Sequence, residues 1–122
     1  MLENSTVFAT IAVRDSQMAK AFYQDMLGLR LVDENDGGCM YESGGGKLFV
    51  YQAPSAGTSQ ATSAAWAVDD IHQMASDLEA KGIVFEHYDM PGAEVDGPVY
   101  TMGGQKAAWF KDPDGNILSI SS

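Results

Sequence analysis

Apolar residues recur along the chain with two alternating periods, and each change of period marks the end of an expected element. Residues 6–13 alternate with a period of two, which is typical of a β-strand with one aliphatic face and one mixed face. The apolar positions within residues 18–27 then follow helical spacing. Asp15 stands where a helix N-cap is expected, and Gly28 stands where that helix should end. The pattern therefore predicts a strand followed by a helix.

Three further strands are expected after this helix, at residues 29–34, 39–43 and 47–52. Two glycine-rich turn signals, at residues 35–38 and 44–46, separate them. One helix and three strands thus follow the first strand.

The pattern then stops and begins again. Residues 53–62 are mostly small and lack an apolar period, which is typical of a linker. A short strand at residues 63–68 leads to Asp69 and Asp70, which are suited to cap a second helix that ends at Gly82. The later strand candidates are residues 83–88, 99–102, 107–111 and 116–120.

Two internal matches indicate that the halves are repeats. Residues 12–15 align with residues 67–70 at an offset of 55, and residues 27–29 align with residues 81–83 at an offset of 54. A helix crossover followed by a meander of strands, repeated, gives two βαβββ modules, and the sheet of each must bury one face under its helix.

We therefore expect an α+β fold within one domain, residues 1–122. It consists of two tandem βαβββ modules, at about residues 5–52 and 63–122, joined by the linker 53–62. Their curved mixed sheets are expected to form a cup with the helices on its outer face. The inside of such a cup is a natural place for a ligand.

The segment 108–118 has the sequence AWFKDPDGNIL. It resembles the last two strands and the aspartate-proline turn of the vicinal oxygen chelate superfamily, which includes glyoxalase I, bleomycin-resistance proteins and extradiol dioxygenases. Residues 22–29 resemble the first helix of that family with its glycine exit, and residues 67–71 resemble the entry to the second helix. The turn itself is expected to be structural rather than catalytic, because Pro113 presets φ and Asp112 can bind the following backbone.

The resemblance also implies where a metal would sit. Enzymes of this superfamily place a divalent metal on the concave face, held by His, Glu or Gln from the first and last strands of each module, because such cations need nitrogen or oxygen ligands. The corresponding positions in this chain are Phe8, Val50 (with Tyr51 one residue further), Ser63 and Ser119. None of these is a good ligand. We therefore expect no metal, no cofactor and no metal-dependent catalytic residue.

The two histidines offer no obvious substitute for those ligands. His72 lies off the apolar stripe of the second helix, so exposure to solvent is expected. His87 is expected on the strand 83–88, where the neighbouring Glu86 points to the opposite face.

Strand parity predicts an apolar lining of the cup with scattered hydroxyl groups. The residues assigned to that face are Thr6, Phe8, Thr10, Ala12, Leu48, Val50, Gln52, Ser63, Ala65, Ala67, Ile117, Ser119 and Ser121. With the aromatic candidates added, the expected ligand-binding residues are Phe8, Thr10, Tyr41, Val50, Ser63, Tyr100, Met102, Trp109 and Ser119. Trp109 faces either the cup or the helix layer, because a shift of one residue reverses the parity. Residues 91–98 are a candidate lid carrying Glu94 and Asp96. The alternative is a cup packed shut or covered by a second subunit.

Composition limits the partners. The formal net charge of -10 repels phosphate backbones and anionic lipid, so neither nucleic acid nor a membrane surface is an expected partner. The single cysteine, Cys39, excludes an internal disulfide, and no signal-peptide pattern or long apolar run is present. A cytoplasmic location is the expectation that follows.

The leading functional hypothesis is a metal-free protein that binds a small molecule. It resembles the bleomycin-resistance proteins, and the compound it sequesters would be cationic or aromatic. A homodimer is expected, because small modules protect exposed sheet edges by association. One alternative is a glyoxalase-like or dioxygenase-like enzyme that acts on a small substrate without the usual metal, with Glu42, Glu86 or His87 as general base. Another is a regulatory subunit that binds through its dimer face.

Overall fold

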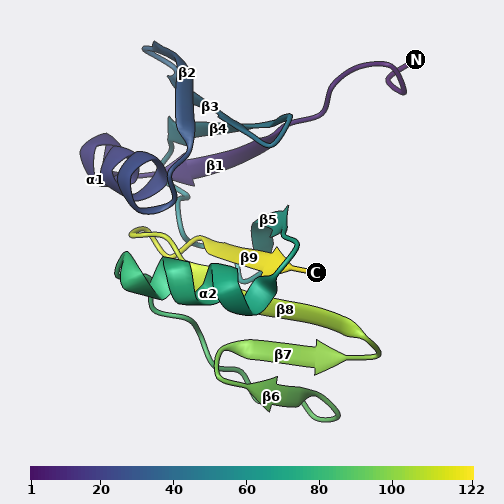
Figure 1. The fold of residues 1–122 in the computed structure, drawn as a ribbon. Helices are drawn as coiled ribbons and strands as arrows, with labels where there is room; N and C mark the ends of the chain where they lie inside the picture. The colour runs from purple at the N-terminus through teal and green to yellow at the C-terminus, as the bar shows by residue number, and fades with distance from the viewer.

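The computed structural model describes residues 1–122 as two modules, one above the other in Figure 1. The first has the expected order βαβββ, and the second has four strands after its helix instead of three. Module 1 contains β1 (Ala9–Val13), α1 (Ser16–Lys20), η1 (Ala21–Met26), β2 (Arg30–Asn35), β3 (Gly38–Ser43) and β4 (Gly46–Gln52). Module 2 contains β5 (Thr62–Ala67), α2 (Ile71–Ala80), β6 (Glu94–Asp96), β7 (Val99–Met102), β8 (Gln105–Lys111) and β9 (Ile117–Ser121). Residues 1–8 extend away from the body of the molecule (Figure 1).

Both predicted helix starts are confirmed. The Asp15 carboxylate accepts hydrogen bonds from the backbone N–H groups of Gln17 and Met18, at 2.9 and 3.1 Å. Asp70 caps α2 in the same way, because its carboxylate accepts from the N–H of Gln73 at 3.1 Å. These bonds satisfy N–H groups that the first turn of a helix leaves without partners.

The first helix changes geometry halfway. α1 continues into η1, a π-helix in which the N–H of Leu27 donates to the carbonyl of Phe22, five residues earlier. Both Phe22 and the adjacent Tyr23 are buried. Both lie on the apolar stripe that the helical spacing predicted; the π-helical geometry itself was not predicted.

Each module has one mixed sheet. The strand order is β1-β4-β3-β2 in the four-stranded sheet and β5-β9-β8-β7-β6 in the five-stranded sheet. β1 is parallel to β4 and β5 is parallel to β9, while the remaining pairs are antiparallel. This arrangement confirms the predicted α+β class with two open mixed sheets. Neither helix is long and apolar enough to span a membrane.

Two predictions in the second module are wrong. Residues 83–88 do not form a strand, because only Phe85 makes a bridge, opposite Phe110. The side chains of Ile83 and Phe85 are nevertheless buried. The apolar alternation therefore indicated which side chains are buried, but not a hydrogen-bonded strand. The segment expected to be a lid, residues 91–98, contains the edge strand β6, paired with β7. Glu94 and Asp96 are exposed on it.

The helix-side faces of the two sheets meet in one shared core. Phe22 of η1 lies 6.4 Å from Phe110 of β8, measured between ring centroids, and Trp66 of β5 lies 6.5 Å from the same ring. The Trp66 indole N–H also donates to Ser43 Oγ of module 1 at 3.1 Å. Because the helix-side faces come together, the open faces of the two sheets lie outside this core instead of facing each other within one chain.

Candidate functional site

The open face of module 1 carries a pair of aromatic rings. Phe49 and Tyr51 of β4 are stacked, with ring centroids 5.9 Å apart and planes 9° from parallel. They lie opposite Thr10 and Ala12 of β1 in the strand register. All four residues belong to the face of the sheet that α1 does not cover, and both rings are partly exposed to solvent.

The open face of module 2 carries a larger aromatic cluster, which consists of Tyr88, Tyr100 and Trp109. The Trp109 ring lies 5.8 Å from Tyr88 and 5.7 Å from Tyr100, with interplanar angles of 77° and 58°. The Tyr100 hydroxyl accepts a hydrogen bond from the Tyr88 N–H and donates one to the Tyr88 carbonyl. These two bonds attach the irregular segment that carries Tyr88 to strand β7. The same bonds fix the position of Tyr88 within the aromatic cluster.

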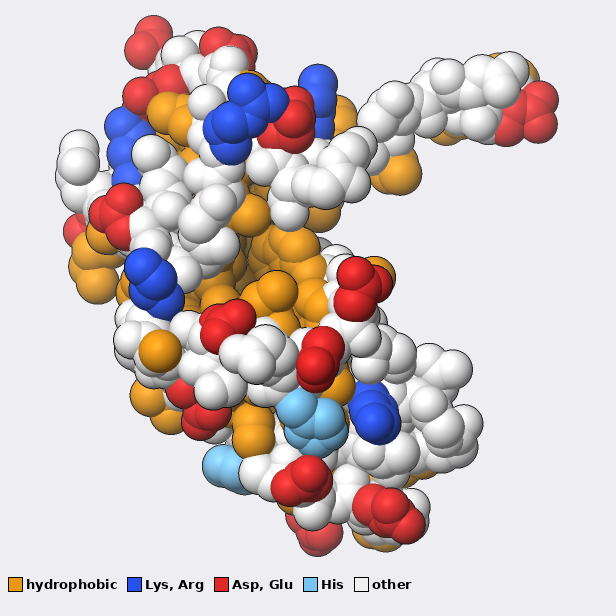
Figure 2. All heavy atoms as spheres, viewed as in Figure 1, with side chains coloured by type: hydrophobic (Ala, Val, Ile, Leu, Met, Phe, Trp, Pro, Cys, Tyr) orange, Lys and Arg blue, Asp and Glu red, His pale blue; other side chains and the backbone are white.

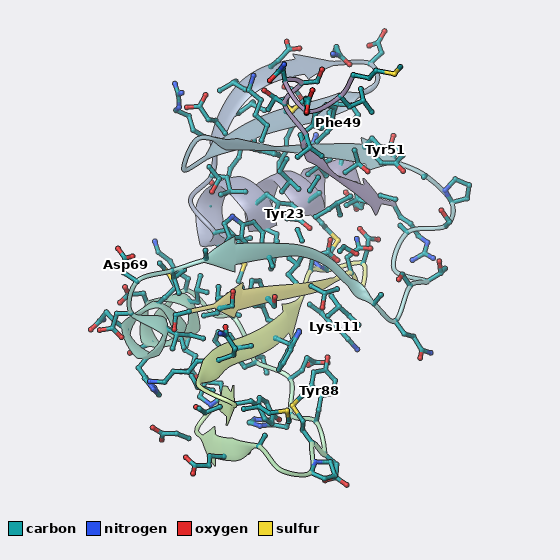
Figure 3. The ribbon with its side chains drawn as sticks, turned by 90° about the vertical axis from the view of Figure 1, so that its right-hand side faces the viewer. Tyr23, Phe49, Tyr51, Asp69, Tyr88 and Lys111 are labelled. Carbon is teal, nitrogen blue, oxygen red and sulfur yellow. The ribbon has the colours of Figure 1, made fainter.

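A cleft of about 420 Å³ opens beside this cluster and includes Tyr88, Met90, Trp109, Lys111 and Ile117 in its lining. Burial raises the pKa of the Tyr88 phenol, and the nearby Glu86 carboxylate raises it further. The phenol therefore stays protonated and uncharged at neutral pH. Figure 3 shows Tyr88 and Lys111 in the lower module and Phe49 and Tyr51 in the upper one.

The charged group in the cleft beside Trp109 is paired. The ammonium of Lys111 lies 3.1 Å from a carboxylate oxygen of Glu86, so the cleft beside Trp109 contains no uncompensated cation. Glu42 is paired with Arg30 at 2.5 Å and lies away from the aromatic cluster. His87 is exposed. The three candidate general bases are thus either engaged in ion pairs or exposed to solvent, and no nucleophile accompanies them.

Most of the expected ligand-binding residues lie on the open faces. Phe8 and Thr10 are partly or fully exposed in and before β1, and Ser63 is half-buried at the irregularity in β5. Tyr100, Trp109 and Ser119 lie together on module 2, where Ser119 is opposite Trp109 in the register. Met102 lies at the exposed end of β7. The orientation of Trp109, which the sequence left open, is therefore toward the open face.

The assignments of Tyr41 and Val50 to the cup are wrong. Val50 pairs with Ile11, and both are nearly inaccessible, at 4% and 1% exposure, beneath α1. Tyr41 is also in the core, where its hydroxyl donates to Gln24 at 3.2 Å. β4 is apolar on both faces, so its alternation could not show which set faces inward. Packing determines which face is buried: the aliphatic residues Leu48 and Val50 lie beneath the helix.

Four further residues of the open faces, Phe49, Tyr51, Tyr88 and Lys111, were not expected to line a site. Phe49 and Tyr51 were missed because of the reversed parity of β4, and Tyr88 because residues 83–88 were assigned to a strand. Lys111 lies in the predicted strand 107–111 but was not expected to line a site. An aromatic pair next to an aliphatic pair on one strand was the available signal. A large aromatic ring is more easily placed on a partly exposed face than in the densely packed space beneath a helix.

The residues present do not fit the metal site of the family. With the corrected register, the positions on the open faces are Phe8, Tyr51, Ser63 and Ser119, and none is a His, Glu or Gln. No three His, Cys, Asp or Glu side chains converge anywhere in the chain. The donor set therefore gives a divalent cation no suitable first coordination shell.

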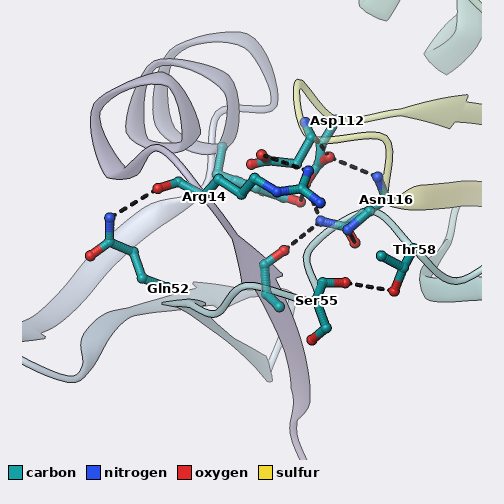
Figure 4. Close-up of polar contacts among 10 residues, drawn as sticks. Arg14, Gln52, Ser55, Thr58, Asp112 and Asn116 are labelled. Carbon is teal, nitrogen blue, oxygen red and sulfur yellow. Dashed lines mark hydrogen bonds and ion pairs between the residues drawn. The ribbon is translucent and has the colours of Figure 1, made fainter.

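The aspartate-proline turn joins the two modules. Asp112 accepts hydrogen bonds from the Tyr23 hydroxyl at 2.7 Å, from the Asn116 side chain at 2.8 Å, and from the N–H groups of Asp114 and Asn116 at 2.9 Å. Asn116 also donates to the carbonyl of Ala12 in β1 at 2.7 Å (Figure 4). Figure 3 shows Tyr23 between the modules. Buried residues of the turn therefore connect the two modules by hydrogen bonds, consistent with the structural role expected of the turn.

Together, these features define a class of protein built from two tandem modules of one mixed sheet each, with a helix on one face of the sheet and an open second face. The sequence matches the profile of the Glyoxalase/Bleomycin resistance protein/Dioxygenase superfamily over residues 6–120. The chain belongs to this superfamily, which confirms the resemblance found in its sequence.

Solved structures show the same fold. A glyoxalase family protein from Enterococcus faecalis has 23% identity and a TM-score of 0.74, with 100% of both chains covered. A lactoylglutathione lyase from Agrobacterium tumefaciens has 20% identity and a TM-score of 0.69, covering 98% of this chain and 94% of that one. An antibiotic-binding protein from a Streptomyces species has 19% identity and a TM-score of 0.69, covering 98% and 96%. No curated protein matches the chain by sequence.

Proposed function

We propose that this protein binds an aromatic small molecule at its open sheet faces and does so without a metal ion, in the manner of an antibiotic-sequestering protein. The observation that carries the proposal is the aromatic cluster of Tyr88, Tyr100 and Trp109 beside a cleft of about 420 Å³. Small-molecule sites typically combine such a volume with apolar and aromatic walls. The fold relationship to an antibiotic-binding protein supports the same reading.

A cationic aromatic compound is the ligand class we favour. The protein carries a formal net charge of -10, which raises the local concentration of cations near its surface. The faces of Trp and Tyr rings attract cations by about 0.5–2 kcal/mol, depending on how far the site is desolvated. Lys111 does not oppose this preference strongly, because Glu86 compensates its charge.

The complete site, in this proposal, is formed by two copies of the chain. Each chain presents two open faces that do not face each other, so a single chain offers only halves of a cup. A two-fold dimer can place the Phe49 and Tyr51 face of one copy opposite the Trp109 face of the other. Such a dimer would enclose the aromatic ligand and would also cover exposed apolar side chains such as Phe8, at 45%, and Met102, at 44% exposure.

The test uses three naphthalene compounds that differ in charge: naphthylethylammonium, naphthylethanol and naphthylacetate. The chain has two tryptophans, so proton–nitrogen correlation spectra contain two indole N–H resonances, which the Trp66→Phe and Trp109→Phe variants assign. We expect the Trp109 resonance to move on titration, most at low concentrations of the ammonium compound and least with the carboxylate. A Trp109 resonance that none of the three compounds moves would rule out the proposed site.

A further inference from the structure

A second cleft, on the other side of the sheets, is a feature that the proposed function leaves unused. It has a volume of about 410 Å³ and lies between the two modules, away from the aromatic cluster. Leu27, Leu29 and Arg30 of module 1 line one wall, and Trp66, Val68 and Met74 of module 2 line the other. Figure 2 shows a hollow between the modules with hydrophobic side chains on its floor. The volume lies within the range of roughly 300–1,000 Å³ that is usual for small-molecule pockets.

The apolar walls of this cleft are only partly buried. Leu27, Leu29, Trp66 and Val68 pack against the core but remain accessible, and Met74 is 37% exposed. Apolar surface that stays wet in a concave site gains free energy when a ligand covers it, by about 25 cal/mol per Å². The modules touch here through few polar contacts, chiefly the hydrogen bond from the Trp66 indole to Ser43. A molecule in the cleft would therefore bridge the modules.

The charge around the cleft is unequal at its two ends. At one end, Arg30 and Glu42 form an ion pair and neutralise each other. At the other end, the cleft continues into a shallower depression that shares Ala67, Val68 and Met74 with it. That depression is lined by Asp69, Asp70 and Asp77 and by no basic residue. Asp70 is occupied as the cap of α2, and one oxygen of Asp77 accepts a hydrogen bond from the Gln73 side chain at 2.8 Å. Asp69 and the second oxygen of Asp77 are left for a ligand.

We propose that this cleft is a second binding site, which takes an amphipathic cation. The apolar body lies between Leu29 and Trp66, and the ammonium group lies toward Asp69 and Asp77. The apolar cleft binds the body of the ligand, and the carboxylates favour a ligand with a positive charge. The proposal does not depend on binding at the open faces, since Trp66 and Trp109 lie on opposite faces of the module 2 sheet.

The same three naphthalene compounds test this second site, with the Trp66 resonance as the reporter in the Trp109→Phe protein. We expect naphthylethylammonium to move the Trp66 resonance with an affinity at least about 3-fold higher than that of naphthylethanol, and naphthylacetate to bind more weakly than both. A cation that moves Trp109 in the unmodified protein but leaves Trp66 unmoved would overturn the second site and leave the first intact. Equal affinities for the three compounds would overturn the proposal as well.

Charge-removing variants sharpen the test. In the Asp69→Asn, Asp77→Asn double variant, we expect the affinity for naphthylethylammonium at Trp66 to fall by about 3- to 10-fold, with no change for naphthylethanol. The matched control is the Glu3→Gln, Glu94→Gln double variant, which removes the same net charge from exposed positions away from the cleft. An equal loss in both double variants would show a general charge effect and would contradict the assigned position of the ammonium group.

Discussion

At the scale of single residues, the most connected group in the molecule is the Asp112 carboxylate. It accepts four hydrogen bonds while only 5% exposed, and its partners come from both modules. A buried carboxylate is tolerated only when such bonds replace the water that it has lost. Asp112 and Tyr23 therefore determine how the modules are held together, although they lie outside both proposed ligand sites.

Replacing Tyr23 with Phe should lower the free energy of unfolding by about 1.5–3 kcal/mol, because it removes a buried hydrogen bond to a charged group. The measurement is urea unfolding at neutral pH. The matched control is Tyr51→Phe, since Tyr51 is partly exposed and its hydroxyl makes no hydrogen bond; we expect a change within about 0.5 kcal/mol. Equal losses in both variants would contradict the role given to the Tyr23 hydroxyl.

The Tyr23 phenol also predicts how stability depends on alkaline pH. Burial raises its pKa far above the ordinary value of 10.0, and the Asp112 carboxylate raises it further. Above pH 10.0 the unfolded chain releases this proton while the native protein retains it, so the stabilising contribution is full below that pH and is lost as the pH rises.

Unfolding measured from pH 9 to 11 should therefore show a steeper decline in the unmodified protein than in Tyr23→Phe, by up to about 1.4 kcal/mol per pH unit. Tyr41, whose pKa burial also raises, is present in both proteins and cancels in the comparison. Parallel declines would show that Tyr23 ionises equally in the native and unfolded states.

At the scale of elements, the linker between the modules is held more tightly than its composition suggests. The Gly57 N–H donates to the Asn116 side chain at 3.2 Å, and Thr58 and Ser55 close a turn beside it (Figure 4). Gly57 has a φ of +71°, and a Cβ added there would lie 1.8 Å from the carbonyl oxygen of Asp114. This close approach of two backbones requires glycine.

Gly57→Ala should consequently destabilise the protein by about 3 kcal/mol or more, through both the left-handed φ and the clash with a backbone atom. Gly44→Ala is the control, because Gly44 has a φ of +53° but nothing within 4 Å of an added Cβ. Its cost should be only about 1–2 kcal/mol. Thermal unfolding of the two variants compares them directly, and an equal effect would mean that the linker can move aside.

At the scale of the whole molecule, the placement of the open faces predicts which chains complete a site. If the Tyr51 face of one copy meets the Trp109 face of the other, a heterodimer of a Tyr51→Ala chain with a Trp109→Ala chain retains one intact site. A heterodimer of the double variant with the unmodified chain then retains none. Binding of naphthylethylammonium to the two purified heterodimers measures this difference. The reverse result would place each site within one chain, and a monomeric solution mass would refute the dimer.

The local elements could be predicted from the sequence because their causes are local. Asp15 and Asp70 cap helices through hydrogen bonds within one turn, and the repeat at an offset of 55 residues marks the second module.

Tertiary structure alone decided which face of each strand is open and how the modules meet. β4 is apolar on both faces, and only packing beneath α1 assigns Val50 to the core and Tyr51 to the open face. The two tryptophans share the second module, but long-range pairing sends Trp109 to the open face and Trp66 to the cleft between modules. The periodicity of a sequence shows that the two faces of a strand differ. Which face is buried depends on contacts with residues far away in the sequence.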